Sequence, residues 1–298
     1  MEFKKITYDD LDTIKKYTLK ADTKNCEFAP ANVCFWNEGE DIRYTIYDDV
    51  LLYRSINKAE GSVIAHYSPL ELPEDPERFI NDIEEDARQT GEKMMISNIS
   101  DEMVHRLGSD MVGQLEFGYD RSFSDYIYLT ESLITLSGSK LHGKKNHLNK
   151  FLKTYDFTYE RIGRENIEEC RQMKNEWAAL KGEDDDEFRE ELHVIDRAFD
   201  AYDIFDFRGG LIRIDGKVVA FTFGEPVSRD TFVTHFEKAY EDIPGLYQAI
   251  NQQFAANELA GFTYVNREDD VGIEGLRRAK LSYRPVMMCD KYYAVKTL

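Results

Sequence analysis

Alternating hydrophobic and polar positions in the first half of the chain predict short strands joined by turns. Residues 43–47 and 50–55 alternate in this way around Asp48-Asp49, which predicts an antiparallel hairpin. Residues 62–67 continue this meander. Hydrophobic positions at helical spacing then predict a helix over 76–90, opened by a proline-rich turn and ended by a glycine. Strands at 93–97 and 124–129 and a helix at 101–107 complete this part.

The second half repeats the same order of elements. Its clearest hairpin joins residues 210–214 to 217–225 through Asp215-Gly216, a turn typical of two-residue hairpin loops. The other expected strands are 231–237, 263–266 and 287–295. The expected helices are 141–152, 166–180, 190–202, 246–259 and 273–281.

Three strands, a helix, a strand, a helix and a strand form an α+β order around a mixed, mostly antiparallel sheet. Because the order occurs twice, we expect two related domains, residues 1–135 and 136–298. The second domain begins near a basic segment in an otherwise acidic chain.

Composition indicates a folded chain and disfavours two classes of binding partner. Of 298 residues, 42% are hydrophobic and 13% aromatic, which is enough for a substantial core. The 38 Lys and Arg residues and the 57 Asp and Glu residues give a net charge of −19. This charge disfavours the binding of nucleic acid and of anionic lipid in general. No hydrophobic run approaches the ~18 residues of a transmembrane helix, and the N-terminus lacks a signal-peptide pattern. We therefore expect a cytoplasmic protein without stable membrane insertion.

The cysteine and histidine spacings give no indication of a metal site. The four cysteines form no C-x-x-C pair, and the six histidines form no H-E-x-x-H. We expect no metal and no disulfide framework.

Residues 139–153 form the strongest local departure from the acidic mean. This segment holds five lysines and two histidines with no acidic residue. It either forms a solvated cationic helix face or lines a cleft for an anionic substrate between the two domains. Lys144, Lys145 and His147 are its candidate ligand-binding residues.

A Pro-Gly turn precedes the helix expected at 246–259. The backbone N–H groups of a helix N-terminus bind phosphate or carboxylate, and a glycine lets a ligand approach the backbone. Gly245, Leu246, Tyr247 and Gln248 are therefore candidates for cofactor binding, unless the turn is an ordinary helix start.

The segment 264–285 combines a strand end, a loop with charges of both signs and a basic helix. Charged residues in a loop after a strand are often functional, although structural ion pairs would have the same pattern. The candidate catalytic residues are Glu237, Asn266, Arg267, Glu268 and Lys280. The two glutamates are candidate bases, and Arg267 and Lys280 are candidate electrostatic stabilisers.

Several blocks of sequence resemble one bacterial family. They are the segments 138–151, 236–239, 264–272 and 275–285, with a weaker match over 25–36. Together they resemble the DUF2156 family, which is similar to the C-terminal catalytic domain of phosphatidylglycerol lysyltransferase. This resemblance spans nearly the whole chain.

The resemblance implies tandem GNAT (acyl-CoA N-acyltransferase) folds, as in the Fem-type aminoacyltransferases. Lys280 stands where the lysyltransferases carry an active-site lysine, and Glu237 where they carry an acidic residue. The membrane-spanning half of the lysyltransferases is absent from this sequence, and residues 243–247 match the glycine-rich pyrophosphate loop only loosely.

Two functions follow from the residues and the resemblance. The first is an acyl- or aminoacyltransferase that acts on a small-molecule donor and an amine or hydroxyl acceptor. We expect CoA or acyl-CoA as the donor rather than aminoacyl-tRNA, because the charge of −19 opposes a large tRNA footprint. The alternative is a non-catalytic GNAT-fold protein that binds CoA or a nucleotide-like ligand.

Overall fold

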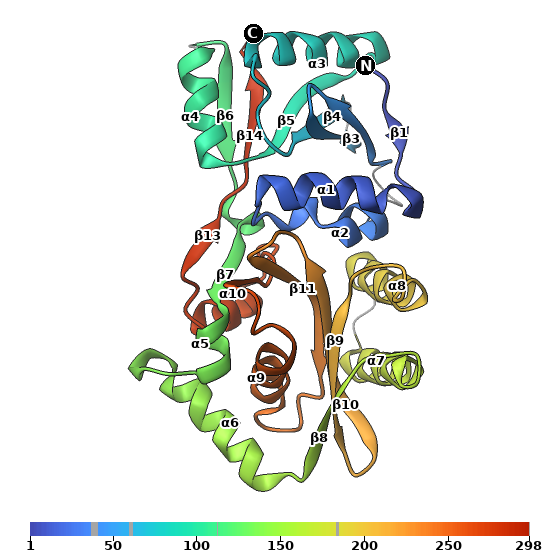
Figure 1. The fold of residues 1–298 in the computed structure, drawn as a ribbon, viewed down its shortest axis with the longest axis vertical. Helices are drawn as coiled ribbons and strands as arrows, with labels where there is room; N and C mark the ends of the chain where they lie inside the picture. Colours follow the sequence, from blue (N-terminus) through green and yellow to red (C-terminus); the bar gives the residue numbers. More distant parts are fainter. Residues whose placement is uncertain (37–40, 60–61, 112, 183–184, 298) are drawn as a thin grey trace. The chain divides into compact units, whose positions relative to one another are not determined.

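The chain folds into two compact units, which we call the first and the second unit. The computed structural model describes residues 1–36, 41–59, 62–111, 113–182 and 185–297 (Figure 1). The first unit comprises Met1–Asp125, Asp269–Gly272 and Cys289–Leu298, and the second comprises Tyr126–Glu268 and Ile273–Met288. No helix within the described residues combines the length and the hydrophobicity needed to cross a membrane.

The first unit is built on a seven-stranded sheet with the order β1-β2-β3-β4-β5-β14-β6. Strands β4 and β5 are parallel, and the other neighbouring strands of this sheet are antiparallel. The strands are β1 (Lys4–Lys5), β2 (Arg43–Tyr47), β3 (Val50–Ala59), β4 (Ser62–Pro69), β5 (Lys93–Ile99), β6 (Leu115–Tyr119) and β14 (Tyr292–Lys296).

Helices cover both faces of this first sheet. One core joins Ile14 and Val33 of α1 and α2 to Leu51 of β3, and the other joins Phe79 of α3 to Leu52, the next residue of the same strand. Successive side chains of a strand point to opposite faces, which explains the two separate cores. The helices are α1 (Leu11–Ala21), α2 (Pro30–Phe35), α3 (Pro76–Thr90) and α4 (Asp101–Asp110).

The second unit repeats this plan. Its sheet has the order β13-β7-β12-β11-β10-β9-β8, and its parallel pair, β11 and β12, corresponds to β4 and β5. The strands are β7 (Asp125–Leu129), β8 (Phe157–Arg161), β9 (Arg208–Ile214), β10 (Lys217–Pro226), β11 (Thr231–Ala239), β12 (Tyr264–Asn266) and β13 (Met287–Cys289).

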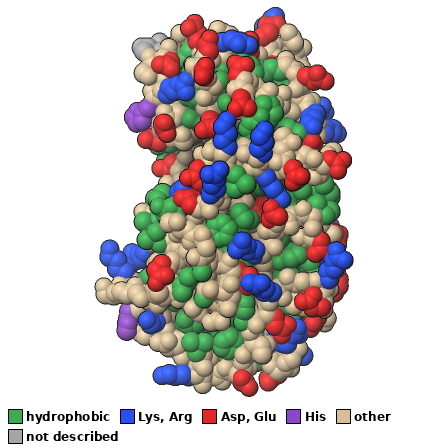
Figure 2. Space-filling model, in the orientation of Figure 1, with side chains coloured by type: hydrophobic (Ala, Val, Ile, Leu, Met, Phe, Trp, Pro, Cys, Tyr) green, Lys and Arg blue, Asp and Glu red, His purple; other side chains and the backbone are tan. Residues whose placement is uncertain are grey.

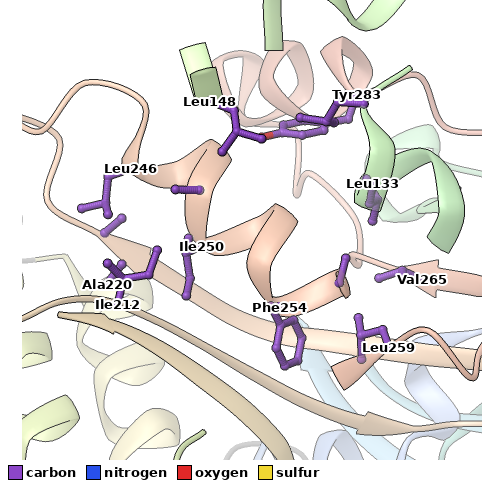
Figure 3. Close-up of a cluster of buried hydrophobic side chains, with 14 of the residues drawn as sticks. Leu133, Leu148, Ile212, Ala220, Leu246, Ile250, Phe254, Leu259, Val265 and Tyr283 are labelled. Carbon is purple, nitrogen blue, oxygen red and sulfur yellow. The ribbon is translucent and has the colours of Figure 1, made fainter. Parts of the chain in front are cut away.

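Helix α9 forms the centre of the second unit's main core. Its Leu246, Ile250 and Phe254 point toward the sheet and pack with Ile212 and Ala220 of β9 and β10 (Figure 3). Helices α7 and α8 lie on the other side of these strands (Figure 1). The helices of this unit are α5 (Thr130–Thr135), α6 (His142–Thr154), α7 (Ile167–Lys181), α8 (Asp186–Asp200), α9 (Leu246–Glu258) and α10 (Glu274–Ser282).

The two units exchange strands, which differs from the expected boundary at residues 135 and 136. Strand β7 follows β6 in sequence but pairs with β12, and β14 returns from the end of the chain to lie between β5 and β6. The single strand expected at 287–295 is therefore wrong. Two strands replace it, separated at Asp290-Lys291, because β13 and β14 belong to different sheets.

A bulge in β11 positions side chains at the end of the parallel pair. Phe223 pairs with Phe236 while Gly224 pairs with Thr234, so His235 is an extra residue on β11. An added Cβ on Gly224 would stand 1.9 Å from the carbonyl oxygen of Val233, which explains the glycine at this close approach. A bulge re-aims the side chains that follow it. Here Glu237, two residues beyond His235, contacts Asn251 of α9.

Candidate functional site

The first site component is an ion pair at the end of the parallel strands. The register of β11 and β12 ends at Val233 and Asn266, and β11 continues beyond it. Arg267 follows β12 and donates from Nη2 to Oε1 of Glu237 over 2.9 Å. Asn251 of α9 donates from Nδ2 to the other carboxylate oxygen of Glu237 over 3.1 Å. Both oxygens of Glu237 are thus engaged, and its carboxylate holds the guanidinium in place.

Aromatic rings and one lysine enclose this pair. The Arg267 guanidinium lies 5.0 Å from the ring centroid of Tyr283 and 5.8 Å from that of Tyr128. Lys144 of α6 places its Nζ 4.3 Å from the centroid of the same Tyr283 ring. Burial, together with the charge of Arg267, lowers the pKa of Lys144, and Glu237 opposes this shift. Lys144 therefore gives up a proton more readily than an exposed lysine.

Three buried polar atoms around Glu237 have no hydrogen-bond partner within the described part of the chain. They are Nη1 of Arg267, Oδ1 of Asn251 and Oγ1 of Thr222. Thr222 lies on β10 directly opposite Glu237 in the strand register. Buried polar groups in native proteins are almost always paired, so a cluster of unpaired ones indicates a place for a ligand or an ordered water. One atom is a donor, one an acceptor and one can be either.

A second charged cluster surrounds the bulged residue. Nδ1 of His235 lies 2.9 Å from Oε1 of Glu268, and Nε2 lies 3.4 Å from Oε1 of Glu225. His235 and Glu225 are buried, whereas the Glu268 side chain is 26% exposed. Burial opposes the charge on His235, but hydrogen bonds to Glu225 and Glu268 outweigh it and raise its pKa to about 9. The imidazolium therefore holds a partly exposed carboxylate.

This cluster predicts a pH dependence of stability. A group whose pKa is raised on folding stabilises the protein fully below its unfolded pKa, and this contribution is lost as the pH rises through the folded value. The unfolding free energy should therefore fall between pH 7 and pH 10. In His235→Gln this fall should be largely absent, whereas His105→Gln, which alters an exposed histidine, should behave as wild type. Urea unfolding at pH 7 and at pH 10 measures this. An equal fall in unfolding free energy between the two pH values in all three proteins would contradict it.

The other predicted catalytic residues lie in the same unit. Asn266 is buried at the end of β12, and its Oδ1 accepts from the N–H of Glu268 over 2.6 Å. Lys280 is the buried residue of α10, with its Nζ 5.8 Å from the Tyr126 ring. Its carbonyl accepts from the Tyr128 hydroxyl, so the Tyr128 side chain contacts both Lys280 and Arg267.

The structure gives the Pro-Gly turn a packing role. Gly245 has φ = 90°, and an added Cβ would stand 2.6 Å from the carbonyl oxygen of His147 on α6. The glycine therefore accommodates α6. Leu246 is buried in the core, while Gln248 interacts with Tyr283 and Tyr247 with the end of β11. Burial, with the nearby charge of Glu237, raises the pKa of Tyr247 to about 12.

The basic segment divides into inward and outward residues. Lys144 is half-buried, but Lys145 and His147 are exposed. Figure 2 shows that Lys and Arg side chains are interspersed with Asp and Glu on the face that it displays.

Four residues of the site were not predicted from the sequence: His235, Glu225, Asn251 and Thr222. Of these, His235 lies next to the block 236–239, and Asn251 lies in the helix that follows the candidate Gly245.

Comparison with known proteins identifies the family. The family model described as "Phosphatidylglycerol lysyltransferase, C-terminal" matches residues 20–295. A protein of unknown function from Bacteroides thetaiotaomicron is 35% identical, with 100% of both chains covered and a TM-score of 0.94.

More distant solved structures share the fold. The C-terminal DUF2156 domain of a protein named as a lysylphosphatidylglycerol synthetase, from Agrobacterium fabrum, is 16% identical with a TM-score of 0.64, covering 96% of this chain and 92% of that one. FemX is 10% identical with a TM-score of 0.65, covering 100% and 98%. The expected α+β, GNAT-like fold class is confirmed. The chain belongs to the DUF2156 family of phosphatidylglycerol lysyltransferase C-terminal domains.

Proposed function

We propose that this protein transfers an aminoacyl group from an activated ester to an amine or hydroxyl acceptor. The observation that carries the proposal is the set of unpaired buried atoms of Arg267, Asn251 and Thr222 around Glu237. The α-amino and carbonyl groups of an aminoacyl ester are two or three bonds apart and complement these atoms. The carbonyl oxygen accepts from Nη1 of Arg267, and the amino group donates to Asn251 and Thr222.

The charge around this position supports acyl transfer. Attack on an ester carbonyl places negative charge on its oxygen, and preorganised cations stabilise that charge. Arg267 and Lys144 supply two positive charges against the single negative charge of Glu237, in a chain whose net charge is −19. We assign Glu237 to the orientation of Arg267, because both of its oxygens are engaged.

The proton acceptor is assigned to Glu268. Its side chain is more exposed than that of Glu237, 26% against 11%, and His235 holds one of its oxygens. Asn266 fixes the backbone at Glu268 through the 2.6 Å hydrogen bond. Lys280 keeps its assignment as a further electrostatic stabiliser; the Tyr128 hydroxyl holds its backbone carbonyl, and its Nζ lies near the Tyr126 ring.

The turn before α9 and the family both support an aminoacyl donor. Helix α6 fills the space at Gly245, where the pyrophosphate of acyl-CoA was expected. The family description names a lysyltransferase, and lysyl is an aminoacyl group. We therefore favour an aminoacyl ester, such as aminoacyl-tRNA, over acyl-CoA. Binding of either donor without transfer would favour the alternative, a non-catalytic binding protein.

Lys144 and its neighbour Lys145 provide a matched test. Lys144→Met removes a cation beside Arg267 and should lower the rate of aminoacyl transfer about tenfold or more, since each electrostatic group at such a centre contributes strongly. Lys145→Met removes the same charge from the exposed side of α6 and should leave the rate unchanged. Single-turnover transfer from radiolabelled aminoacyl-tRNA measures both. Equal losses would show that only the general charge of α6 matters.

A further inference from the structure

A buried lysine in the first unit contacts a cysteine and two carboxylates. Nζ of Lys291 lies 2.8 Å from Oδ1 of Asp125, 2.8 Å from Oε1 of Glu27 and 3.4 Å from Sγ of Cys26. The Cys26 thiol donates to Oδ1 of Asp125 over 3.2 Å, and its backbone N–H donates to Oδ2 over 2.9 Å. One carboxylate therefore contacts both the thiol and the ammonium.

The members of this cluster come from distant parts of the sequence. Cys26 and Glu27 belong to a short 3-10 helix (Cys26–Phe28), Asp125 opens β7, and Lys291 precedes β14. Asp269, 3.7 Å from Lys291 Nζ, lies in the loop after β12. The cluster thus ties the start of β14 to the first unit at the point where that strand enters the sheet.

The cluster is buried but borders the surface at one of its members. The side chains of Lys291 and Asp125 are 4% and 0% exposed, but Glu27, which contacts Lys291, is 41% exposed. Cys170 and Cys289 differ from Cys26, because burial raises the pKa of each thiol to about 12 and makes them poor nucleophiles. Cys26 differs from both in having the Nζ of a lysine within hydrogen-bonding distance of its sulfur.

We propose that Cys26 and Lys291 form a modification site at which peroxide joins the two side chains covalently. The Sγ and Nζ atoms are already in contact, so bond formation requires only a small movement of the two side chains. A covalent link here would fasten the beginning of β14 to the segment that precedes α2.

The reaction balances with hydrogen peroxide as the oxidant. The thiol and one peroxide give a sulfenic acid and water, and sulfur loses two electrons to the peroxide. Asp125 accepts the ammonium proton of Lys291. The amine then attacks sulfur, an S–N bond forms, the S–O bond breaks, and the hydroxyl leaves as water with one N–H hydrogen. A second peroxide can insert one oxygen between sulfur and nitrogen, with release of another water.

Peptide mass spectrometry tests this site on the intact protein. After treatment with hydrogen peroxide and digestion without reductant, we expect a joined pair of peptides that contain Cys26 and Lys291. Its mass equals the sum of the two peptides less two hydrogens, with or without one added oxygen. Most of the linear Cys26 peptide should be lost, and dithiothreitol should restore it.

Two variants make the test specific. Lys291→Arg keeps the charge beside Asp125 but removes the nucleophilic amine, so it should form no joined pair while Cys26 still oxidises. Cys34→Ser should behave as wild type. The proposal is overturned if wild-type Cys26 oxidises to sulfinic or sulfonic acid with no joined pair. It is also overturned if Cys26 stays unmodified in the folded protein, or if the pair forms equally in urea.

Discussion

Replacement of Lys291 by Met is expected to lower the free energy of unfolding by about 3–5 kcal/mol, because it removes the buried cation that lies 2.8 Å from the fully buried carboxylate of Asp125. Met keeps much of the apolar length of lysine, so the loss reports mainly on charge. Urea unfolding monitored by circular dichroism measures it.

Lys296→Met is the matched control for this prediction. Lys296 lies in the same C-terminal segment and pairs with Glu84, but both side chains are partly exposed, so its loss should cost at most about 1 kcal/mol. Equal effects of the two substitutions would mean that the Lys291 cluster does not anchor β14.

Arg267→Lys is expected to reduce aminoacyl transfer by about 100-fold. Lysine keeps a positive charge beside Glu237 but cannot reproduce the planar donors that reach Glu237 and the proposed carbonyl oxygen at the same time. The fold should persist, since the buried charge pair is retained.

Arg208→Lys controls for a general loss of arginine in the second unit. Arg208 is exposed, donates to the carbonyl of Glu258 and lies over the Phe262 ring. Its substitution should leave transfer unchanged. Normal transfer by Arg267→Lys would remove Arg267 from the reaction centre.

Local signals predicted individual elements well. The helix expected at 76–90 is confirmed at those bounds, because Asp75 caps its start through the N–H of Arg78 and Gly91 ends it with φ = 77°. The strand expected at 43–47 is also confirmed at those bounds. Helix α8 begins at Asp186, four residues before the helix expected at 190–202, because the Asp185 side chain caps it through the N–H of Phe188.

Features set by tertiary pairing were beyond the sequence. The exchange of β7 and β14 depends on which sheet each strand joins, and a strand pattern at 287–295 carries no such information. The bulge at His235 is a property of the β10–β11 register, so neither the His235 cluster nor the direction of Glu237 could be predicted.

The candidate site could be predicted only in part, because its packing also depends on tertiary structure. Sequence reasoning selected Glu237, Arg267 and Lys144 from three separate segments, and the structure brings them around one tyrosine, Tyr283. It assigned Gly245 to a ligand because a glycine at a helix start allows close approach. Only the position of α6 reveals that another helix makes that approach.

Transfer assays with two labelled donors test the central claim most directly. A pool of tRNA charged with radiolabelled amino acids and radiolabelled acetyl-CoA would each be incubated with the protein and a panel of amine and hydroxyl acceptors. The proposed function predicts that label passes from tRNA to an acceptor with wild type and that Arg267→Lys loses this transfer. Transfer of the acetyl group alone, or binding of charged tRNA with no transfer to any acceptor, would contradict it.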